Sequence, residues 1–130
     1  MTPIRPDVEP STAEFEVHLA ENVSMTARDG TQLVADVYRP ARDGTALAGP
    51  LPTLLQRTPY DKSEVELTNA EARWFAARGY VAVVQDCRGC FRSGGDVDFL
   101  IPEAEDGADT MTWLAQQSWY DGTVGTWGCS

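Results

Sequence analysis

The sequence predicts an α/β fold in which a β-hairpin precedes strands that alternate with helices, in the order β-α-β-α-β. Residues 15–27 and 33–38 alternate apolar and polar side chains around Asp29-Gly30, a pattern typical of two strands joined by a tight turn. Residues 80–84 are a continuous apolar run, which is typical of a central strand buried on both faces. Helical patterns separate this run from its neighbours, so these strands are expected to pair in parallel through right-handed crossovers.

The chain of 130 residues is long enough for one modest hydrophobic core. Hydrophobic residues make up 42% and charged residues 23%, a composition typical of a globular domain. Residues 1–13 hold three prolines and few apolar side chains, which predicts a flexible tail ahead of a domain over residues 14–130. No segment has the pattern of a signal peptide or a membrane span, so we expect a soluble, cytoplasmic protein.

The chain is strongly acidic, with ten Lys and Arg against twenty Asp and Glu and a formal net charge of −10. Such a charge repels phosphate backbones and anionic membranes. We therefore expect neither nucleic acid nor a membrane surface as a partner.

His18 is the only histidine of the chain. It falls on the polar side of the first strand, where a solvated histidine is favoured over a catalytic one. After the hairpin, residues 40–52 are rich in Gly, Ala and Pro, which predicts a surface loop. Residues 53–56 are a short apolar run, which predicts a strand buried on both faces.

The first helix is marked by Thr68 and Glu71, which have the spacing of a capping box. Gly79 predicts its end, because glycine is favoured just after a helix. The apolar residues of this segment predict an inner face made of Leu67, Trp74, Phe75 and Ala77.

The second helix is expected to begin near Pro102, because proline suits the first turn of a helix. Gly107 inside the helix predicts close packing against a neighbour. The apolar spacing predicts a buried stripe made of Ala104, Ala108, Met111, Leu114 and Ala115. Residues 122–127 then predict a last strand, which leads directly to residues 128–130.

Three cysteines, Cys87, Cys90 and Cys129, are an odd number and cannot form a closed set of disulfides. Cys87 and Cys90 form a C-x-x-C motif, which leaves a zinc site and a redox dithiol open. A zinc site would need two more ligands, and only Cys129 and His18 remain, neither at the spacing of a zinc finger. A redox dithiol favours a first cysteine at a helix start, whereas Arg88-Gly89 predicts a turn. We favour incidental reduced thiols, with no metal and no cofactor.

Asp86 and Arg88 flank Cys87 at the end of the central strand. An ion pair between them would hold the loop that follows, and we favour this over a catalytic role, which would need a pocket that shifts their pKa values.

Candidate catalytic residues follow the carboxyl ends of the predicted parallel strands, where the sites of open α/β sheets lie. Gly128-Cys129-Ser130 has the form G-x-S directly after a strand, as in a nucleophile elbow, where a tight turn presents a serine Oγ above the sheet. Ser130 is therefore a candidate nucleophile, against the alternative of a chance G-x-S. Tyr60 follows another strand and could donate its phenol O–H to an oxyanion; its alternative role is that of an aromatic covering a strand end.

Several short motifs follow one another in order along the chain. They are Val-Tyr-Arg-Pro (37–40), Arg-Thr-Pro-Tyr-Asp-Lys (57–62), Arg-Gly-Tyr-Val (78–81), Gln-Asp-Cys-Arg-Gly (85–89), Ser-Gly-Gly (93–95), Trp-Leu-Ala-x-Gln-x-Trp (113–119) and Asp-Gly-x-Val-Gly (121–125). This succession resembles the N-terminal part of the Xaa-Pro dipeptidyl-peptidase and cocaine-esterase family of α/β-hydrolases. The resemblance implies that Ser130, at the family's G-x-S-Y serine, is the nucleophile and that Tyr60, in the P-Y-D motif, is an oxyanion donor. Cys90 departs from the basic residue expected in its turn, which concerns loop packing more than chemistry.

The resemblance also implies parts that this sequence does not contain: a helical cap, a jelly-roll domain, and the acid and histidine of the triad after the serine. His18 precedes the serine, whereas the triad order is Ser, then Asp or Glu, then His. We therefore expect residues 14–130 to be an incomplete α/β-hydrolase domain, truncated at the nucleophile elbow and inactive alone. The expected parent activity is hydrolysis of a small-molecule ester, an amide or a short peptide through an acyl-enzyme. The alternatives are a non-catalytic truncated fragment or binding module, and a dithiol redox module.

The strand order of α/β-hydrolases, which the resemblance implies, places the strand at residues 80–84 in the centre of the sheet. The last strand then pairs with residues 53–56 and has an unpaired outer edge. We expect this last strand to be less buried than the central one, as judged by Val124 and Trp127. An unpaired edge with apolar surface beside it favours association of copies, so a homo-oligomer is one expected consequence.

Overall fold

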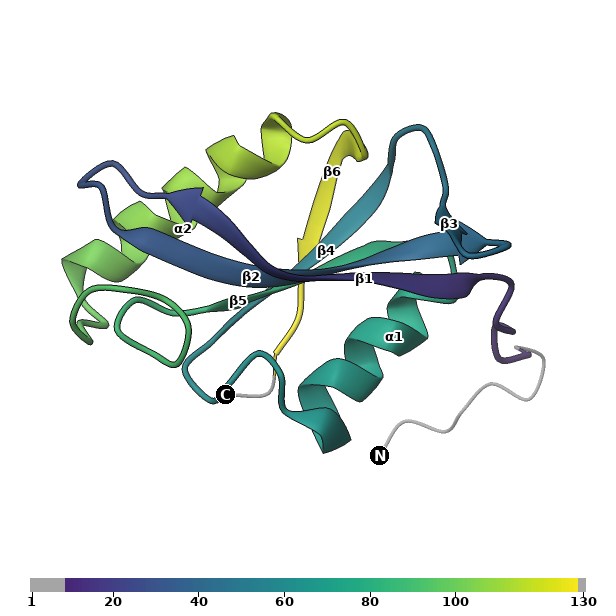
Figure 1. Ribbon diagram of the computed structural model, residues 1–130, viewed down its shortest axis with the longest axis horizontal. Coiled ribbons are helices and arrows are strands. Elements are labelled where there is room, and N and C mark those ends of the chain that lie inside the picture. The colour runs from purple at the N-terminus through teal and green to yellow at the C-terminus, as the bar shows by residue number, and fades with distance from the viewer. Residues whose placement is uncertain (1–8, 129–130) are drawn as a thin grey trace.

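The computed structural model describes residues 9–128, with the side chains of residues 65 and 66 excepted. Its elements are β1 (Glu16–Thr26), β2 (Gln32–Arg42), β3 (Thr45–Ala46), β4 (Leu51–Thr58), the π-helical segment η1 (Val65–Asn69), α1 (Ala70–Ala76), β5 (Val81–Asp86), α2 (Ile101–Ala115) and β6 (Tyr120–Thr126). The strands form one sheet in the order β1-β2-β5-β4-β6, and β3 is added to β2 (Figure 1). The predicted α/β class and the hairpin followed by β-α-β-α-β are confirmed. No helix in the described part of the chain is long and apolar enough to span a membrane.

The central strand is β5, as the strand order predicted. It pairs antiparallel with β2 on one side and parallel with β4 on the other. β4 in turn pairs parallel with β6. The β1–β2 hairpin turns at Gly30, whose φ of +87° is readily adopted by glycine. The mixed sheet therefore has an antiparallel half and a parallel half.

The two faces of the sheet are covered by different helices (Figure 1). On one face, Leu114 of α2 and Trp119 pack on alternate residues of the strands, among them Val83. On the other face, Ala72 and Ala76 of α1 pack on Tyr38, Ala82 and Val84. The middle of the sheet is thus buried on both faces, so a ligand can reach the sheet at the ends of its strands.

The surface loop predicted over residues 40–52 is wrong in its first half. β2 continues to Arg42, turns at Asp43-Gly44 with φ values of +53° and +77°, and returns as β3. Pro40 is fully buried and lies opposite Val17 of β1. The second Asp-Gly pair is the same hairpin signal as Asp29-Gly30, so the sequence held the information that this strand is longer.

The capping box predicted at Thr68 and Glu71 is wrong. The helical chain begins earlier, at Val65, so Thr68 lies inside it. The Glu71 carboxylate instead accepts a hydrogen bond from Trp127 Nε1 at 2.7 Å, which links α1 to the end of β6. The predicted end is confirmed: α1 stops at Ala76, and Gly79 follows with φ +101°.

The inner face predicted for this helix is also wrong in part. Thr68, Ala72 and Ala76 are buried at intervals of four residues, whereas Leu67 and Trp74 are 46% and 49% exposed. Small side chains on the inner face let the helix approach the sheet closely, so the larger apolar residues lie outside. Of the predicted residues, Phe75 does pack against the cluster on this face of the sheet.

Helix α2 begins at Ile101 with Pro102 in its first turn, as predicted. Its predicted stripe is wrong except for Leu114, because Ala104, Ala108, Met111 and Ala115 are exposed. The buried face of α2 is polar instead, with Asp106 and Thr110 directed at partners on the sheet and the loop after β5. A Cβ at Gly107 would lie 3.8 Å from Arg57 Nη1, an ordinary contact, so the predicted need for glycine is not observed.

The edge strand β6 has the predicted burial. Within residues 9–128, β6 is hydrogen-bonded to β4 and to no second strand. Val124 and Trp127 are half-buried, whereas Val81 and Val83 in β5 are fully buried. The side of β6 away from β4 is therefore unpaired in the described structure.

Candidate active site at the carboxyl edge of the sheet

The carboxyl ends of β4, β5 and β6 lie at one edge of the sheet, because the three strands are parallel. Thr58 is paired with Asp86 at the last position of β4 and β5, and the Cys87 N–H donates to the Thr58 carbonyl at 3.0 Å. The Trp127 N–H donates to the Leu55 carbonyl at 3.2 Å. The segments that follow the three strands therefore leave the sheet as neighbours (Figure 1).

Tyr60 lies at this edge, two residues beyond the end of β4. Its backbone N–H donates to Thr58 Oγ1 at 3.0 Å, and its side chain is 62% exposed. The structure thus places Tyr60 where the sequence predicted it, at the end of a strand in the parallel half of the sheet. The exposed ring can meet a ligand that approaches this edge.

Ser130 and Cys129 lie outside the described residues, so the predicted nucleophile remains a prediction. The described chain reaches Gly128, just past β6. Trp127 anchors this exit through its hydrogen bond to Glu71 and an edge-to-face contact with Phe75, with ring centroids 5.3 Å apart. The strand that leads to Ser130 is therefore fixed both to β4 and to α1.

Lys62 is buried beneath the loop that carries Tyr60, with 3% exposure. Its Nζ donates to Asp36 Oδ1 of β2 at 2.7 Å and to Asn22 Oδ1 of β1 at 2.8 Å. Its backbone N–H donates to Asp86 Oδ1 at 2.8 Å. The sequence analysis missed this cluster, although Asp36 is a charged residue within an otherwise apolar run, which was the available signal.

The predicted ion pair between Asp86 and Arg88 is wrong. Asp86 is fully buried and accepts the backbone N–H groups of Lys62 and Arg92, at 2.8 and 3.0 Å; burial raises the pKa of this carboxyl. Arg88 turns the other way, with Nη2 2.7 Å from Asp106 Oδ1 and Nη1 2.8 Å from Asp29 Oδ2. Both residues hold the loop after β5, Asp86 through backbone groups within that loop and in the loop after β4, and Arg88 through carboxylates far away in the sequence.

A second buried polar cluster joins β4, β5 and α2. Arg57 Nε donates to Gln85 Oε1 at 2.7 Å, and Nη1 pairs with Glu103. Thr110 Oγ1 donates to the same Gln85 oxygen at 2.9 Å. Polar partners on the sheet thus explain why the inner face of α2 is not apolar.

The thiols of Cys87 and Cys90 are both buried and free. Burial raises the pKa of Cys87 to about 12, and the nearby Glu103 carboxylate adds to this effect. Burial also raises the pKa of Cys90. A redox dithiol needs an accessible thiolate, so these environments disfavour the redox alternative. Residues 9–128 contain no cluster of three or more His, Cys, Asp or Glu that could hold a metal ion.

His18 is exposed on β1, opposite Arg39 of β2. Its strand lies at the far edge of the sheet, separated from β4 by β2 and β5. The solvated role predicted for this histidine agrees with that position, which does not bring it to Tyr60.

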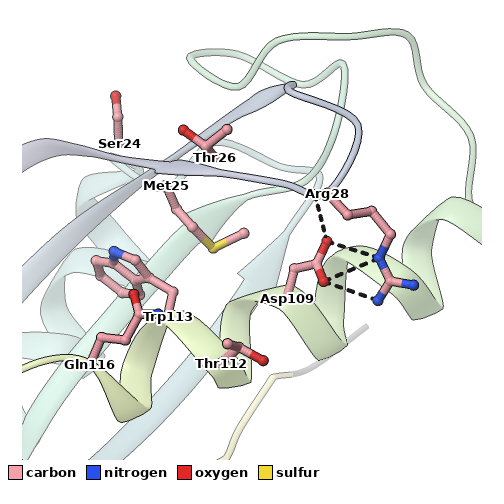
Figure 2. A pocket seen from close by; sticks show the side chains of 8 residues that line it. All are labelled: Ser24, Met25, Thr26, Arg28, Asp109, Thr112, Trp113 and Gln116. Atoms are coloured by element: carbon pink, nitrogen blue, oxygen red, sulfur yellow. Dashed lines mark hydrogen bonds and ion pairs between the residues drawn. The ribbon is translucent and has the colours of Figure 1, made fainter.

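A separate hollow of about 390 Å³ lies between the end of β1 and α2 (Figure 2). Met25 and Trp113 line it, and Arg28 and Asp109 close one end. The Arg28 guanidinium donates to both Asp109 oxygens, at 3.0–3.2 Å, which lowers the pKa of Asp109. With Arg28 engaged in this way, the pair serves to brace the hairpin turn against α2.

Comparison with known proteins gives these features a context. Residues 29–130 match the family described as X-Pro dipeptidyl-peptidase (S15 family). The chain belongs to this family. The resemblance inferred from the ordered motifs is thus confirmed, and the S15-family chain is part of a family of hydrolases.

Individual relatives of the S15-family chain agree with this assignment. It is 41% identical over 115 residues to the cocaine esterase of Rhodococcus sp. (strain MB1 Bresler). This alignment covers 86% of the present chain and 19% of the esterase. The structure of an α-amino acid ester hydrolase superposes on this chain with 29% identity and a TM-score of 0.70. The match covers 98% of this chain and 24% of the hydrolase. A CocE/NonD family hydrolase from Staphylococcus aureus shares the fold, with a TM-score of 0.71 at 19% identity. The match covers 94% of this chain and 28% of the hydrolase. The chain spans about a fifth of the length of the curated relative, and the predicted α/β-hydrolase fold is confirmed.

Proposed function

We propose that the S15-family chain is part of a serine hydrolase that cleaves an ester or peptide bond through an acyl-enzyme, with Ser130 as nucleophile and Tyr60 as oxyanion donor. The observation that supports this most is the position of Tyr60. It follows β4, the strand that pairs in parallel with β6, and β6 leads directly to Gly128-Cys129-Ser130. A nucleophile elbow and a donor on the neighbouring strand then face the same edge of the sheet.

The proposed reaction begins when Ser130 Oγ attacks the substrate's carbonyl carbon and passes its proton to a general base. The Tyr60 O–H donates to the oxygen that becomes negatively charged. Collapse of this intermediate expels an alcohol or an amine, which takes the proton, and water later releases the acid in the same way.

The general base is proposed to be a histidine supplied by polypeptide beyond this sequence, oriented by an acidic residue. The histidine present, His18, is exposed on β1 and separated from β4 by two strands. For the 130-residue chain alone, this position favours the non-catalytic alternative.

We base the proposed substrate class on the family, described as X-Pro dipeptidyl-peptidase, and on the names of two similar proteins, a cocaine esterase and an α-amino acid ester hydrolase. An ester, an amide or a short peptide with an accessible carbonyl fits this range. The net charge of −10 disfavours strongly anionic substrates. No cofactor is required for this chemistry.

A fluorophosphonate probe tests the assignment, because it reacts with an activated serine. The gene product that contains this chain is labelled and digested, and the modified peptide is found by mass spectrometry. Stoichiometric labelling at Ser130 that Ser130→Ala abolishes is the expected result. Labelling of another serine contradicts the assignment of Ser130 as the nucleophile. No labelling in a folded protein contradicts the proposal and favours a binding role.

A further inference from the structure

We propose that Lys62 is a positioning residue for Tyr60: the buried Lys62–Asp36 ion pair fixes the turn that presents the Tyr60 hydroxyl. The proposal rests on the role of Tyr60 as oxyanion donor given above. It extends the catalytic machinery to β1 and β2, which carry none of the proposed catalytic groups.

The turn that carries Tyr60 has an unusual backbone. Asp61 has a φ of +84°, a region that residues with a side chain adopt at a cost. Its carboxylate accepts the N–H and Oγ–H of Ser63 at 3.0 and 2.6 Å, and these bonds lower the pKa of Asp61. Such a conformation persists where the surroundings fix it from several sides. Tyr60 therefore depends on anchors before and after Asp61.

The anchor before Asp61 is β4 itself, through the hydrogen bond from the Tyr60 N–H to Thr58 Oγ1. The anchor after it is Lys62, which is held at both ends. Its backbone N–H is bound by the buried Asp86 at the end of β5, and its Nζ by Asp36 and Asn22. One residue thus connects the loop after β4 to three other strands, through its side chain to β1 and β2 and through its backbone to β5.

The ion pair is buried on both sides, with side-chain exposures of 3% for Lys62 and 4% for Asp36. Apolar residues of similar size often give equal or greater stability at such a site, so stability alone does not explain a buried pair. The pair also fixes the orientation of the Lys62 side chain, because two oxygens, of Asp36 and Asn22, bind its ammonium group. Asp36 Oδ1 also accepts the Asn22 N–H at 3.0 Å, where Asn22 has φ +54° in the irregular part of β1.

This arrangement has a kinetic consequence. A donor to an oxyanion must lie within hydrogen-bond reach of the position that the charged oxygen occupies. A shift of about 1 Å can cost about a hundredfold in rate. Loosening the Lys62 anchor should therefore lower kcat and leave KM nearly unchanged, because the oxyanion exists only after attack.

The first test uses the 130-residue chain and needs no catalysis. Lys62→Met combined with Asp36→Asn removes both charges together, and the amide at position 36 still accepts the Asn22 N–H. NMR measures the Asp61 HN–Hα coupling, backbone relaxation at residues 60 and 61, and amide exchange at residue 62. We expect an altered coupling, added motion and at least about tenfold faster exchange. A folded variant with wild-type signals at these residues overturns the proposal.

The matched control is Arg88→Met with Asp106→Asn. This pair is similarly buried, with side-chain exposures of 11% and 1%, but it holds α2 and has no bond to residues 60–62. In this control variant the NMR signals of residues 60–62 should stay as in wild type. If the control and the Lys62→Met/Asp36→Asn variant disturb these signals equally, the proposal is overturned.

Asn22→Gly is a milder variant: it allows the positive φ, keeps the N–H and removes one Nζ acceptor. Asn22→Gly should cause the same changes at smaller amplitude. If its signals at residues 60–62 equal those of the wild type, that result counts against the proposal.

The second test uses the intact hydrolase and a double-mutant cycle. Lys62→Met/Asp36→Asn should lower kcat about 10- to 100-fold with KM within about twofold. In a Tyr60→Phe background the same pair should cause little further loss, because it acts through the hydroxyl that is missing. Additive losses overturn the positioning role. If Tyr60→Phe by itself leaves kcat unchanged, the proposed function fails, and the NMR result still decides whether Lys62 fixes the turn.

Discussion

Tyr60 is 62% exposed at the end of β4, and Lys62, two residues later, is 3% exposed. The exposed phenol can meet a ligand, whereas the buried ammonium can meet only protein groups. The proposed oxyanion donor and its proposed anchor are thus near neighbours in one loop with opposite exposure to solvent. Substitutions of the two residues should differ accordingly in what they change.

Replacing Tyr60 by Phe removes the hydroxyl and retains the ring. In the intact hydrolase we expect kcat to fall by about 10²–10³, the usual loss when one oxyanion donor is removed. The midpoint of urea unfolding should stay close to wild type, because the ring is largely in solvent. Steady-state kinetics with a p-nitrophenyl ester measures the first quantity, and an unchanged kcat would return Tyr60 to the role of a covering aromatic.

Cys87 predicts a pH dependence of stability. Burial raises its pKa to about 12 in the folded chain, whereas an unfolded thiol titrates near about 8.5. Above about pH 8.5 the unfolded state has lost this proton and the folded state retains it. The contribution of Cys87 is therefore fully present below that pH and is lost as the pH rises toward about 12.

Urea unfolding between pH 8 and about 11 checks this sign. The free energy of unfolding should fall with rising pH, and Cys87→Ala should make the decline shallower. Tyr38, whose pKa burial raises to about 12, contributes to the remaining slope. An identical slope in wild type and Cys87→Ala contradicts the prediction.

At the residue scale, the sequence could indicate Tyr60 and Ser130 as candidates because short motifs carry them. It could not indicate the partners of Asp86, since these are backbone N–H groups brought near by loops. The Asp86–Arg88 pair was expected from adjacency in the chain. The carboxylates that Arg88 binds are 59 and 18 residues away, a separation that only the fold closes.

At the element scale, α2 is the clearest case of an amphipathic pattern with an unexpected orientation. Except for the buried Leu114, its predicted apolar stripe faces outward, and its inner face binds Arg88 through Asp106 and Gln85 through Thr110. Periodicity could predict where this helix begins, but not which side faces the sheet, because buried polar groups with partners satisfy the inner side. The same limit applies to α1, where alanines, not the large aromatic Trp74, face inward.

The polar attachment of α2 predicts a contrast between two aspartates three residues apart. Asp106→Ala leaves the Arg88 guanidinium largely buried with Asp29 as its one remaining carboxylate partner and the Thr31 hydroxyl as a neutral acceptor, and should cost about 3 kcal/mol of unfolding free energy. Asp109→Ala breaks an exposed pair with Arg28 and should cost much less. Urea unfolding of both variants measures the difference. Equal losses would show that burial of an ion pair does not determine its contribution to the free energy of unfolding.

At the scale of the whole molecule, the strand order could be predicted because the resemblance to α/β-hydrolases implies it. The two-sided burial of the central strand could be predicted from its continuous apolar run. The length of β2 could not be predicted as easily, since its buried Pro40 suggests a loop until the Asp43-Gly44 turn is recognised. The candidate site could be predicted only in part: motifs indicate Tyr60 and Ser130 as candidates, whereas the Lys62–Asp36 pair joins residues 26 positions apart, which only the fold brings together.

The 130-residue chain alone should show no triad-level turnover. Its one histidine is exposed on β1, and a serine without a general base is a poor nucleophile at neutral pH. Enzymes that lack a triad member retain only about 10³–10⁴ over the rate in water. Assay with a p-nitrophenyl ester checks this, with Ser130→Ala as control. A rapid turnover that Ser130→Ala abolishes would contradict the prediction.

The central position of β5 also constrains the order of events during synthesis. β1 and β2 are adjacent in sequence and can pair as soon as both have left the ribosome, since hairpins form in about 1–10 μs. β4 emerges after the short β3 and has no neighbour in place, because β5, which lies between it and β2, and β6 are both made later. At about 5–20 residues per second, the nascent chain spends seconds with the edges of β2 and β4 open. Emergence of residues 81–86 joins the two halves in one step, so a pause in translation just before this segment would prolong the interval in which the chain is most open to aggregation.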